Sequence, residues 1–126
     1  MNIHAPFVSA YSQLEKGLPA RSVAKYIKTG ELLAEDVYRV VPERTFKRRI
    51  SENAKLRTEE ADAILRLLRV RATSIWAFGD PKLADEFLSL KNPRLGHHIP
   101  REMAATDAGA RDVEALLQRF VFGDFS

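Results

Sequence analysis

The chain has 126 residues, of which 45% are hydrophobic and 29% charged, and its net charge is +3. This suits one domain, or two small helical lobes, and argues against wholesale disorder. The absence of cysteine excludes disulfide scaffolds, thiolate zinc sites and cysteine nucleophiles. No apolar run approaches the roughly 20 residues of a membrane-spanning helix, and residues 1–13 show no secretion signal, so we expect a cytoplasmic protein with no membrane partner.

The charge is unevenly distributed along the chain. Residues 1–72 hold 14 Lys and Arg against 9 Asp and Glu, a net charge of +5. Residues 73–126 hold 6 against 8, a net charge of −2. A basic first part joined to a slightly acidic second part indicates two different surfaces, of which the basic one could bind phosphate.

Three helices are predicted in the first part. Residues 1–18 have no clear period, and we interpret them as an N-terminal arm with a short helix near residues 8–16. Pro19 suits the first turn of a helix that Gly30 ends. A second helix follows from Leu32–Ala34, and Pro42 breaks it and starts a third.

The longest regular pattern follows Thr58, a candidate N-cap. Its apolar residues recur at steps of three and four, which predicts about five helical turns ending at Gly79. The predicted buried residues are Ala61, Ile64, Leu65, Leu68, Ala72, Ile75 and Trp76.

Asp80 and Pro81 predict the start of another helix, which should run to Leu90 and bury Leu83, Phe87 and Leu88. After a turn and a loop, a short helix is expected from Pro100 to Thr106, and a last one from about Ala108 to Phe122, capped by Gly123. The apolar face of the last helix comprises Val113, Leu116, Leu117, Phe120 and Val121. No segment alternates with period two, so the predicted fold is all-α.

Basic residues are concentrated in the third helix. In helical register Phe46 and Ile50 face the core, and the exposed positions are Arg44, Thr45, Lys47, Arg48 and Arg49. Such a helix fits a major groove, where arginine can donate to guanine and lysine or threonine can hold phosphates. The preceding helix and the break before Pro42 complete a helix-turn-helix outline. A solvated basic face is an equally open interpretation.

No residue group has the arrangement of a catalytic, cofactor or metal site. His97 and His98 are adjacent and cannot easily bind one metal from the same face. The serines lack a nucleophile elbow and the glycines belong to no phosphate loop. We therefore expect neither an enzyme nor a cofactor, and we assign Trp76 to the core.

The second half contains several spaced motifs. They are Trp76-Ala77-Phe78-Gly79-Asp80, Phe87-Leu88, Asn92-Pro93-Arg94-Leu95-Gly96, Ile99-Pro100 and Phe122-Gly123. Their order and spacing resemble the C-terminal toxin-binding domain of the MbcA/ParS/Xre antitoxin family. Thr45, Arg48 and Arg49 match the R-T-x-x-R-R stretch of that family's Xre-like helix-turn-helix. The resemblance extends from about Gly17 to the C-terminus.

This resemblance implies an antitoxin of a type II toxin–antitoxin pair, whose partner is a RES-domain toxin that consumes NAD. It implies an Xre-like helix-turn-helix domain over residues 19–72, joined through the long helix to a toxin-binding domain over residues 73–126. The antitoxin would form a homodimer within a hetero-oligomeric complex. It would cover the toxin's active site and repress its own operon by binding operator DNA.

The resemblance also directs attention to the loops and the end of the chain. The residues expected to bind toxin are Leu95, His97, His98, Arg101, Phe122, Asp124, Phe125 and Ser126. Phe122 and Phe125 are the strongest candidates, since aromatic anchors concentrate binding energy at interfaces. The alternative is a stand-alone helix-turn-helix regulator whose C-terminal half serves dimerisation or sensing.

Overall fold

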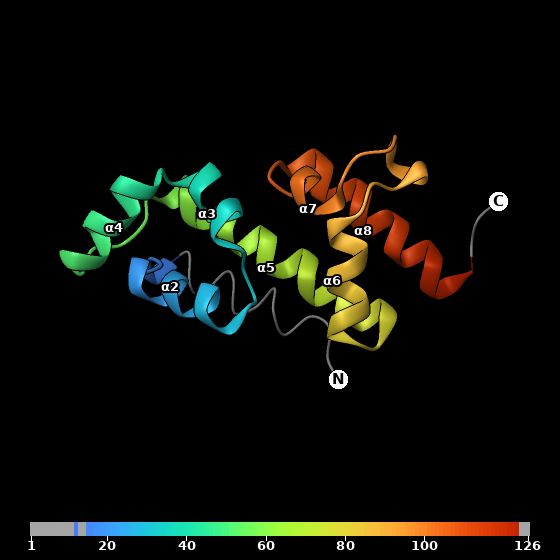
Figure 1. Cartoon of the computed structure of the whole chain (residues 1–126), viewed down its shortest axis with the longest axis horizontal. Coiled ribbons are helices and arrows are strands. Elements are labelled where there is room, and N and C mark those ends of the chain that lie inside the picture. The colour runs from blue at the N-terminus through green and yellow to red at the C-terminus, as the bar shows by residue number, and fades with distance from the viewer. Residues whose placement is uncertain (1–11, 13–14, 124–126) are drawn as a thin grey trace. The chain divides into compact units, whose positions relative to one another are not determined.

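The computed structural model describes Ser12 and residues 15–123 (Figure 1). In that part of the chain we find seven α-helices, one short 3-10 helix and no strand, which confirms the all-α prediction. The contacts define two compact units, and the chain passes from one to the other between Leu68 and Arg69 of helix α5 (Thr58–Phe78). The helix predicted near residues 8–16 lies largely outside the described residues.

The N-terminal unit contains α2 (Ala20–Thr29), α3 (Ala34–Val40), α4 (Glu43–Ser51) and the first half of α5. Pro19 is the N-cap residue of α2 and lies just before the first turn in which it was predicted. As predicted, Gly30 ends the helix, in the left-handed conformation at φ 85°. The loop after α4 pairs with the start of α2, because the Ala20 N–H donates to the Ala54 carbonyl at 3.0 Å. The side chains buried at the centre of this unit are Leu18, Val23, Val37, Val41, Phe46 and Ile64.

The buried face of α5 differs in part from the predicted stripe. Its first half buries the predicted Ala61, Ile64 and Leu65 together with Leu67. Its second half buries Val70, Thr73 and Ser74, whereas Leu68, Ala72, Ile75 and Trp76 are only half-buried. The hydroxyls of Thr73 and Ser74 donate to the carbonyls of Arg69 and Val70, at 3.0 and 2.8 Å. These polar side chains are thus buried with their donors satisfied, which an apolar pattern does not reveal.

The C-terminal unit contains the second half of α5, α6 (Pro81–Ser89), the 3-10 helix η1 (Pro93–Leu95), α7 (Pro100–Met103) and α8 (Asp107–Phe122). Asp80 caps α6 as predicted, since its carboxylate accepts from the N–H groups of Lys82 and Leu83. Thr106 caps α8, and its hydroxyl accepts from the Gly109 N–H at 3.0 Å. Local side-chain chemistry therefore sets the starts of both helices.

Two bidentate ion pairs join the second half of α5 to its neighbours. Arg69 donates to both carboxylate oxygens of Glu114 on α8, at 3.1 and 2.8 Å. Arg71 donates to both oxygens of Asp85 on α6, at 2.9 and 3.1 Å. Two parallel hydrogen bonds restrict orientation as well as distance, so these pairs help to fix α6 and α8 against α5.

Three apolar side chains that the pattern placed in the core are exposed. Leu83 on α6 is 47% exposed, and Phe120 and Val121 on α8 are 55% and 39% exposed. The buried residues of α8 end at Leu117, although its apolar face continues for another turn. Periodicity shows which face of a helix is apolar, but it does not show how far neighbouring helices cover that face. No helix of the described chain is both long and apolar enough to cross a membrane.

Gly109 provides a test of the packing between α7 and the start of α8. A Cβ atom at this position would lie 2.0 Å from the Met103 carbonyl oxygen, so backbone would have to move. We expect Gly109→Ala to lower the free energy of unfolding by roughly 1–3 kcal/mol, despite the roughly 1 kcal/mol that alanine gains in helix propensity. Urea denaturation measures this change.

The matched control is Ala108→Ser, which adds one atom at the exposed preceding position. It should change stability by no more than about 0.5 kcal/mol. A Gly109→Ala protein as stable as wild type would contradict the close approach of Met103.

Candidate functional site

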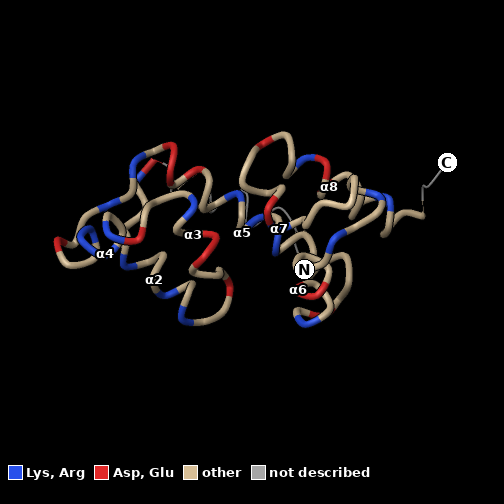
Figure 2. Tube along the Cα trace, turned by 45° about the horizontal axis from the view of Figure 1, so that its top comes forward, with Lys and Arg blue, Asp and Glu red and all other residues tan. Residues whose placement is uncertain are grey.

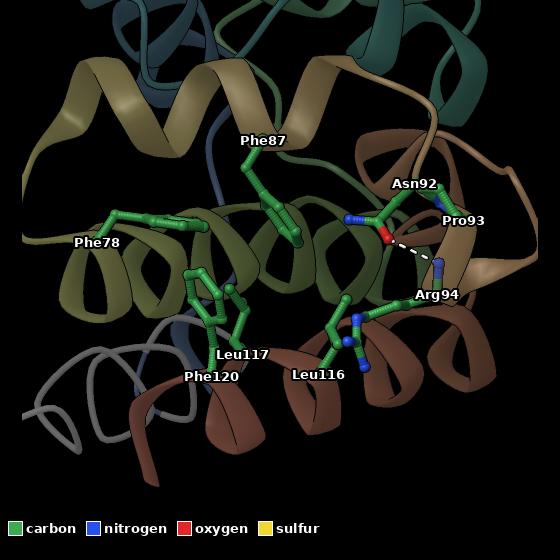
Figure 3. A pocket seen from close by; sticks show the side chains of 8 residues that line it. All are labelled: Phe78, Phe87, Asn92, Pro93, Arg94, Leu116, Leu117 and Phe120. Carbon is green, nitrogen blue, oxygen red and sulfur yellow. Dashed lines mark hydrogen bonds between the residues drawn. The ribbon is translucent and has the colours of Figure 1, made fainter. Parts of the chain in front are cut away.

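An apolar pocket of about 260 Å³ lies in the C-terminal unit (Figure 3). Its lining residues come from the end of α5, from α6, from the segment around η1 and from α8: Phe78, Phe87, Asn92, Pro93, Arg94, Leu116, Leu117 and Phe120. The ring of Phe78 lies 5.2 Å from that of Phe87 and 5.3 Å from that of Phe120. An aromatic hollow of this kind can accept an apolar side chain of a partner.

A second, more polar pocket of about 350 Å³ adjoins the first, because Arg94 and Leu116 line both. Its charged or titratable lining residues are Arg94, His98, Asp112 and Arg119. The side-chain oxygen of Asn92 accepts from the Arg94 N–H at 2.9 Å and caps η1, which fixes the backbone that carries Arg94. The two pockets together present an apolar and a predominantly basic hollow next to each other.

The last turn of α8 presents its aromatic side chains to solvent. Phe122 is 73% exposed, and its ring lies 6.2 Å from that of Trp76. With Phe120 and Val121 it forms what we call the α8 surface, and Phe120 also lines the apolar pocket. Trp76, expected in the core, is half-buried. Contiguous exposed apolar side chains typically mark interaction sites.

The residues expected to bind toxin differ in their exposure to solvent, and three of them lie outside the described residues. His98 is exposed and lines the polar pocket with Leu95, whose side chain is buried. His97 is exposed in a left-handed conformation at φ 61°, and its N–H donates to the Asn92 carbonyl at 2.8 Å. Arg101 is half-buried and Phe122 is exposed, whereas Asp124, Phe125 and Ser126 lie outside the described residues.

The sequence prediction did not include the residues that line the apolar pocket. The sequence placed Phe87 and Phe120 on the apolar faces of their helices, as core residues, and named Phe78 only as part of the first spaced motif. The available signal was the apolar face of α8, which continues beyond Leu117. Within the described residues, no three His, Asp or Glu side chains are grouped closely enough to hold a metal ion.

Figure 2 shows basic and acidic residues along α4, and the side chains of its basic residues differ in exposure and in partners. Arg44 is exposed, and Thr45 is half-buried. Lys47 pairs with Glu43 at 2.7 Å, and Arg48 pairs with Glu52 at 3.5 Å; all four of these side chains are exposed. The hydrogen bond from Lys47 to Glu43 and the attraction between their charges raise the pKa of Lys47 above its ordinary value.

Arg49 has a different environment from the rest of α4. Its side chain is only 12% exposed, and its guanidinium donates to the carboxylate of Glu60 in the first turn of α5. The same carboxylate accepts from the backbone N–H of Arg57 at 2.8 Å. Burial by itself raises the pKa of Glu60, but the hydrogen bonds from Arg49 and Arg57 and their positive charges outweigh it, so the pKa lies below its ordinary value. Arg49 therefore joins two helices rather than facing solvent.

Comparison with known proteins identifies the C-terminal part of the chain. Residues 71–123 match the family model described as the antitoxin Xre/MbcA/ParS C-terminal toxin-binding domain. An Antitoxin Xre of Photorhabdus laumondii is 30% identical over 87% of this chain and 76% of its own length. The chain belongs to the Xre/MbcA/ParS antitoxin family. It is thus the antitoxin of a toxin–antitoxin system, a regulatory protein with a toxin as partner and not an enzyme.

Two further relatives support the assignment. An Antitoxin Xre of Pseudomonas putida is 26% identical over 90% of this chain and 71% of its own length. One of Yersinia enterocolitica is 32% identical over 68% of this chain and 59% of its own length. Both pockets and the α8 surface fall within residues 71–123, the part of this antitoxin that matches the toxin-binding domain.

The Glu60 carboxylate predicts how the antitoxin's stability depends on pH. Glu60→Gln should lower the free energy of unfolding at pH 7 by about 1–3 kcal/mol. The substitution replaces a charged, largely buried carboxylate with a neutral amide, which accepts more weakly from Arg49 and Arg57. Since the pKa is lower in the folded state than in the unfolded state, the carboxylate stabilises the fold above the ordinary value of 4.5. That contribution is lost as the pH falls below 4.5 and through the folded pKa.

Wild type and Glu60→Gln should be denatured at several pH values between pH 7 and pH 3. The difference between their free energies of unfolding should shrink as the pH falls through this acid range. Glu59→Gln is the control, since Glu59 is exposed in the same turn of α5. If Glu60→Gln and Glu59→Gln had equal effects at every pH, Glu60 would have no special role in joining α4 to α5.

Proposed function

We propose that this antitoxin neutralises a RES-domain, NAD-consuming toxin by covering the toxin's active site with its C-terminal unit. The observation that carries the proposal is the exposed α8 surface beside the apolar pocket, within the match to a toxin-binding domain. The identity of the toxin rests on the resemblance of the spaced motifs to antitoxins of RES toxins. Antitoxin and toxin would meet in the cytoplasm.

The physical basis of the binding is the burial of aromatic side chains. Phe122 and Phe120 expose most of their rings, so covering them removes apolar surface from water. The apolar pocket would receive a side chain from the toxin, and the adjoining pocket with Arg94 and Arg119 would lie at the edge of the interface. An apolar centre bordered by charged groups is the usual organisation of a protein–protein interface.

A second function, repression of the antitoxin's own operon, is favoured by the exposed basic residues of α4. Arg44, Lys47 and Arg48 are exposed. Exposed pairs such as Lys47–Glu43 are weak, so these cations can exchange a carboxylate for a DNA phosphate. Arg49 is held by Glu60, and we therefore assign it to positioning α4 rather than to binding DNA. A homodimer would present two such helices to a symmetric operator.

The toxin-binding proposal predicts the effect of changing the α8 surface. Phe120→Ser combined with Phe122→Ser should raise the Kd for the cognate toxin at least about tenfold, since buried aromatic anchors dominate interface energies. Calorimetry with purified toxin measures the affinity, and growth on co-expression measures neutralisation.

Leu90→Ser is the control, because Leu90 is also apolar and 64% exposed but lies outside the α8 surface. It should leave the Kd unchanged. Unaltered toxin binding by the Phe120/Phe122 variant would refute the assigned surface, and loss of binding by both variants would point to a general effect of exposed apolar side chains.

The DNA-binding proposal predicts a change in salt dependence. Arg44→Ala combined with Arg48→Ala should weaken binding to a duplex from the antitoxin's own promoter. It should also reduce the slope of log K against log salt by about 0.9 for each phosphate that the variant no longer neutralises. Fluorescence anisotropy at several salt concentrations measures both quantities, and toxin binding should be retained.

Arg111→Ala is the control, because Arg111 is an exposed arginine of the C-terminal unit, paired with Asp107. If wild type bound no promoter duplex, the repression proposal would fail while toxin neutralisation could stand. Promoter binding by a protein that neither binds nor neutralises the neighbouring toxin would favour a stand-alone transcription regulator.

A further inference from the structure

Helix α2 has a wholly basic set of charged residues. Its ten residues include Arg21, Lys25 and Lys28 and no Asp or Glu. All three side chains are exposed. Steps of four and three residues place them on one face of the helix, opposite the buried Ala20 and Val23. We call this face the α2 stripe.

The α2 stripe begins beside the end of the basic helix. Helices α2 and α4 are in contact within the N-terminal unit, and Figures 1 and 2 both show them side by side. The Nε–H of Arg21 donates to the Ile50 carbonyl at 3.1 Å, near the C-terminal end of α4. This bond uses one of the five N–H donors of the guanidinium, so four remain for another acceptor. The stripe is thus anchored next to α4 while its charge stays available.

The charge of the α2 stripe is less neutralised than that of α4. Lys47, Arg48 and Arg49 of α4 each pair with a glutamate. No carboxylate of the described chain forms an ion pair with Arg21, Lys25 or Lys28. Like charges four residues apart repel each other along a helix, so Arg21 and Lys25 destabilise α2 slightly unless an anion lies against them. A polyanion would remove this repulsion.

We propose that the α2 stripe is a second phosphate-binding surface, which holds the DNA backbone next to the segment that α4 binds. This inference rests on the proposed DNA binding. From Arg21 to Lys28 the stripe is about 10 Å long, at 1.5 Å per helical residue. One DNA strand presents a phosphate about every 3.4 Å along the axis, so the stripe can follow roughly three of them. Such interactions add affinity and position the protein without reading the sequence.

The test uses full-length antitoxin and the promoter duplex. Lys25→Gln combined with Lys28→Gln removes two charges at exposed positions. We expect the Kd to rise about tenfold or more at moderate salt, and the slope of log K against log salt to fall by about 1.8, since two phosphates are no longer neutralised. A scrambled duplex of the same length should lose affinity by a similar factor, because the stripe does not read bases. Toxin affinity should not change.

Two further variants make the outcome specific. Lys82→Gln combined with Lys91→Gln removes the same charge from exposed lysines of the C-terminal unit and should leave the slope unchanged. Lys25→Arg combined with Lys28→Arg keeps the charge and should bind like wild type.

Four results would overturn the inference. An unchanged slope for the Lys25/Lys28 glutamine variant, while wild type binds the promoter, would remove the α2 stripe and leave DNA binding by α4 intact. An equal loss of affinity in the Lys82/Lys91 control would show a general charge effect. Weaker binding of a single-stranded RNA by the Lys25/Lys28 glutamine variant, with promoter binding equal to that of wild type, would assign the stripe to a different nucleic acid. Absence of promoter binding by wild type would remove the underlying function together with the inference.

Discussion

The carboxylate of Glu60 determines how the basic helix is held. It accepts from the guanidinium of Arg49 at the end of α4 and from the backbone N–H of Arg57 immediately before α5. The second bond is half of a capping box, in which the third helical residue reaches back to the N-cap. One side chain thus defines the start of α5 and fixes the last turn of α4 against it. Because Arg49 serves this purpose, Arg44, Lys47 and Arg48 are left to define the exposed basic surface of α4.

Helix ends could be predicted because their causes are local. Asp80 and Pro81 lie next to the turn that they create, and Gly30 and Gly123 adopt the left-handed conformation, which glycine enters without the steric cost of a Cβ atom. Thr58 is a partial exception, since it is the first residue of α5 rather than its cap. The cap there involves the Glu60 side chain and the Arg57 N–H, and a Ser or Thr signal alone does not identify it.

Burial could not be predicted with the same success, because it depends on residues distant in sequence. Ser74 is fully buried although it is polar, and its hydroxyl is satisfied by the Val70 carbonyl one turn earlier. Phe120 is exposed because the helices of the described chain leave the last turn of α8 uncovered. Leu95 shows the same difficulty for the site. The motif resemblance marked it for toxin binding, but its side chain is buried at the end of the 3-10 helix η1, which Asn92 caps. A motif does not separate residues that shape a loop from those that its surface exposes.

Charge in this antitoxin shows why clustering in sequence is an incomplete guide to a binding surface. The run from Arg44 to Arg49 is conspicuous, yet three of its four cations pair with carboxylates. The basic residues of α2 are separated by apolar and small residues, and only helical geometry brings them onto one face. The electrostatic potential at a bound phosphate depends on unpaired charge rather than on the number of basic residues. Helix α2 therefore contributes more to this potential than its composition suggests.

The last turn of α8 combines exposure with order, and this bears on how the antitoxin can bind its toxin. The Gly123 N–H donates to the Arg119 carbonyl, which completes the helix up to Phe122. The rings of Phe120 and Phe122 lie against those of Phe78 and Trp76, so their orientations are restricted while most of their surface faces solvent. Ordering side chains at an interface costs about 0.5–1.5 kcal/mol for each one immobilised on binding. Rings that are already held avoid part of that cost, so this short surface can contribute more affinity than flexible side chains of equal area.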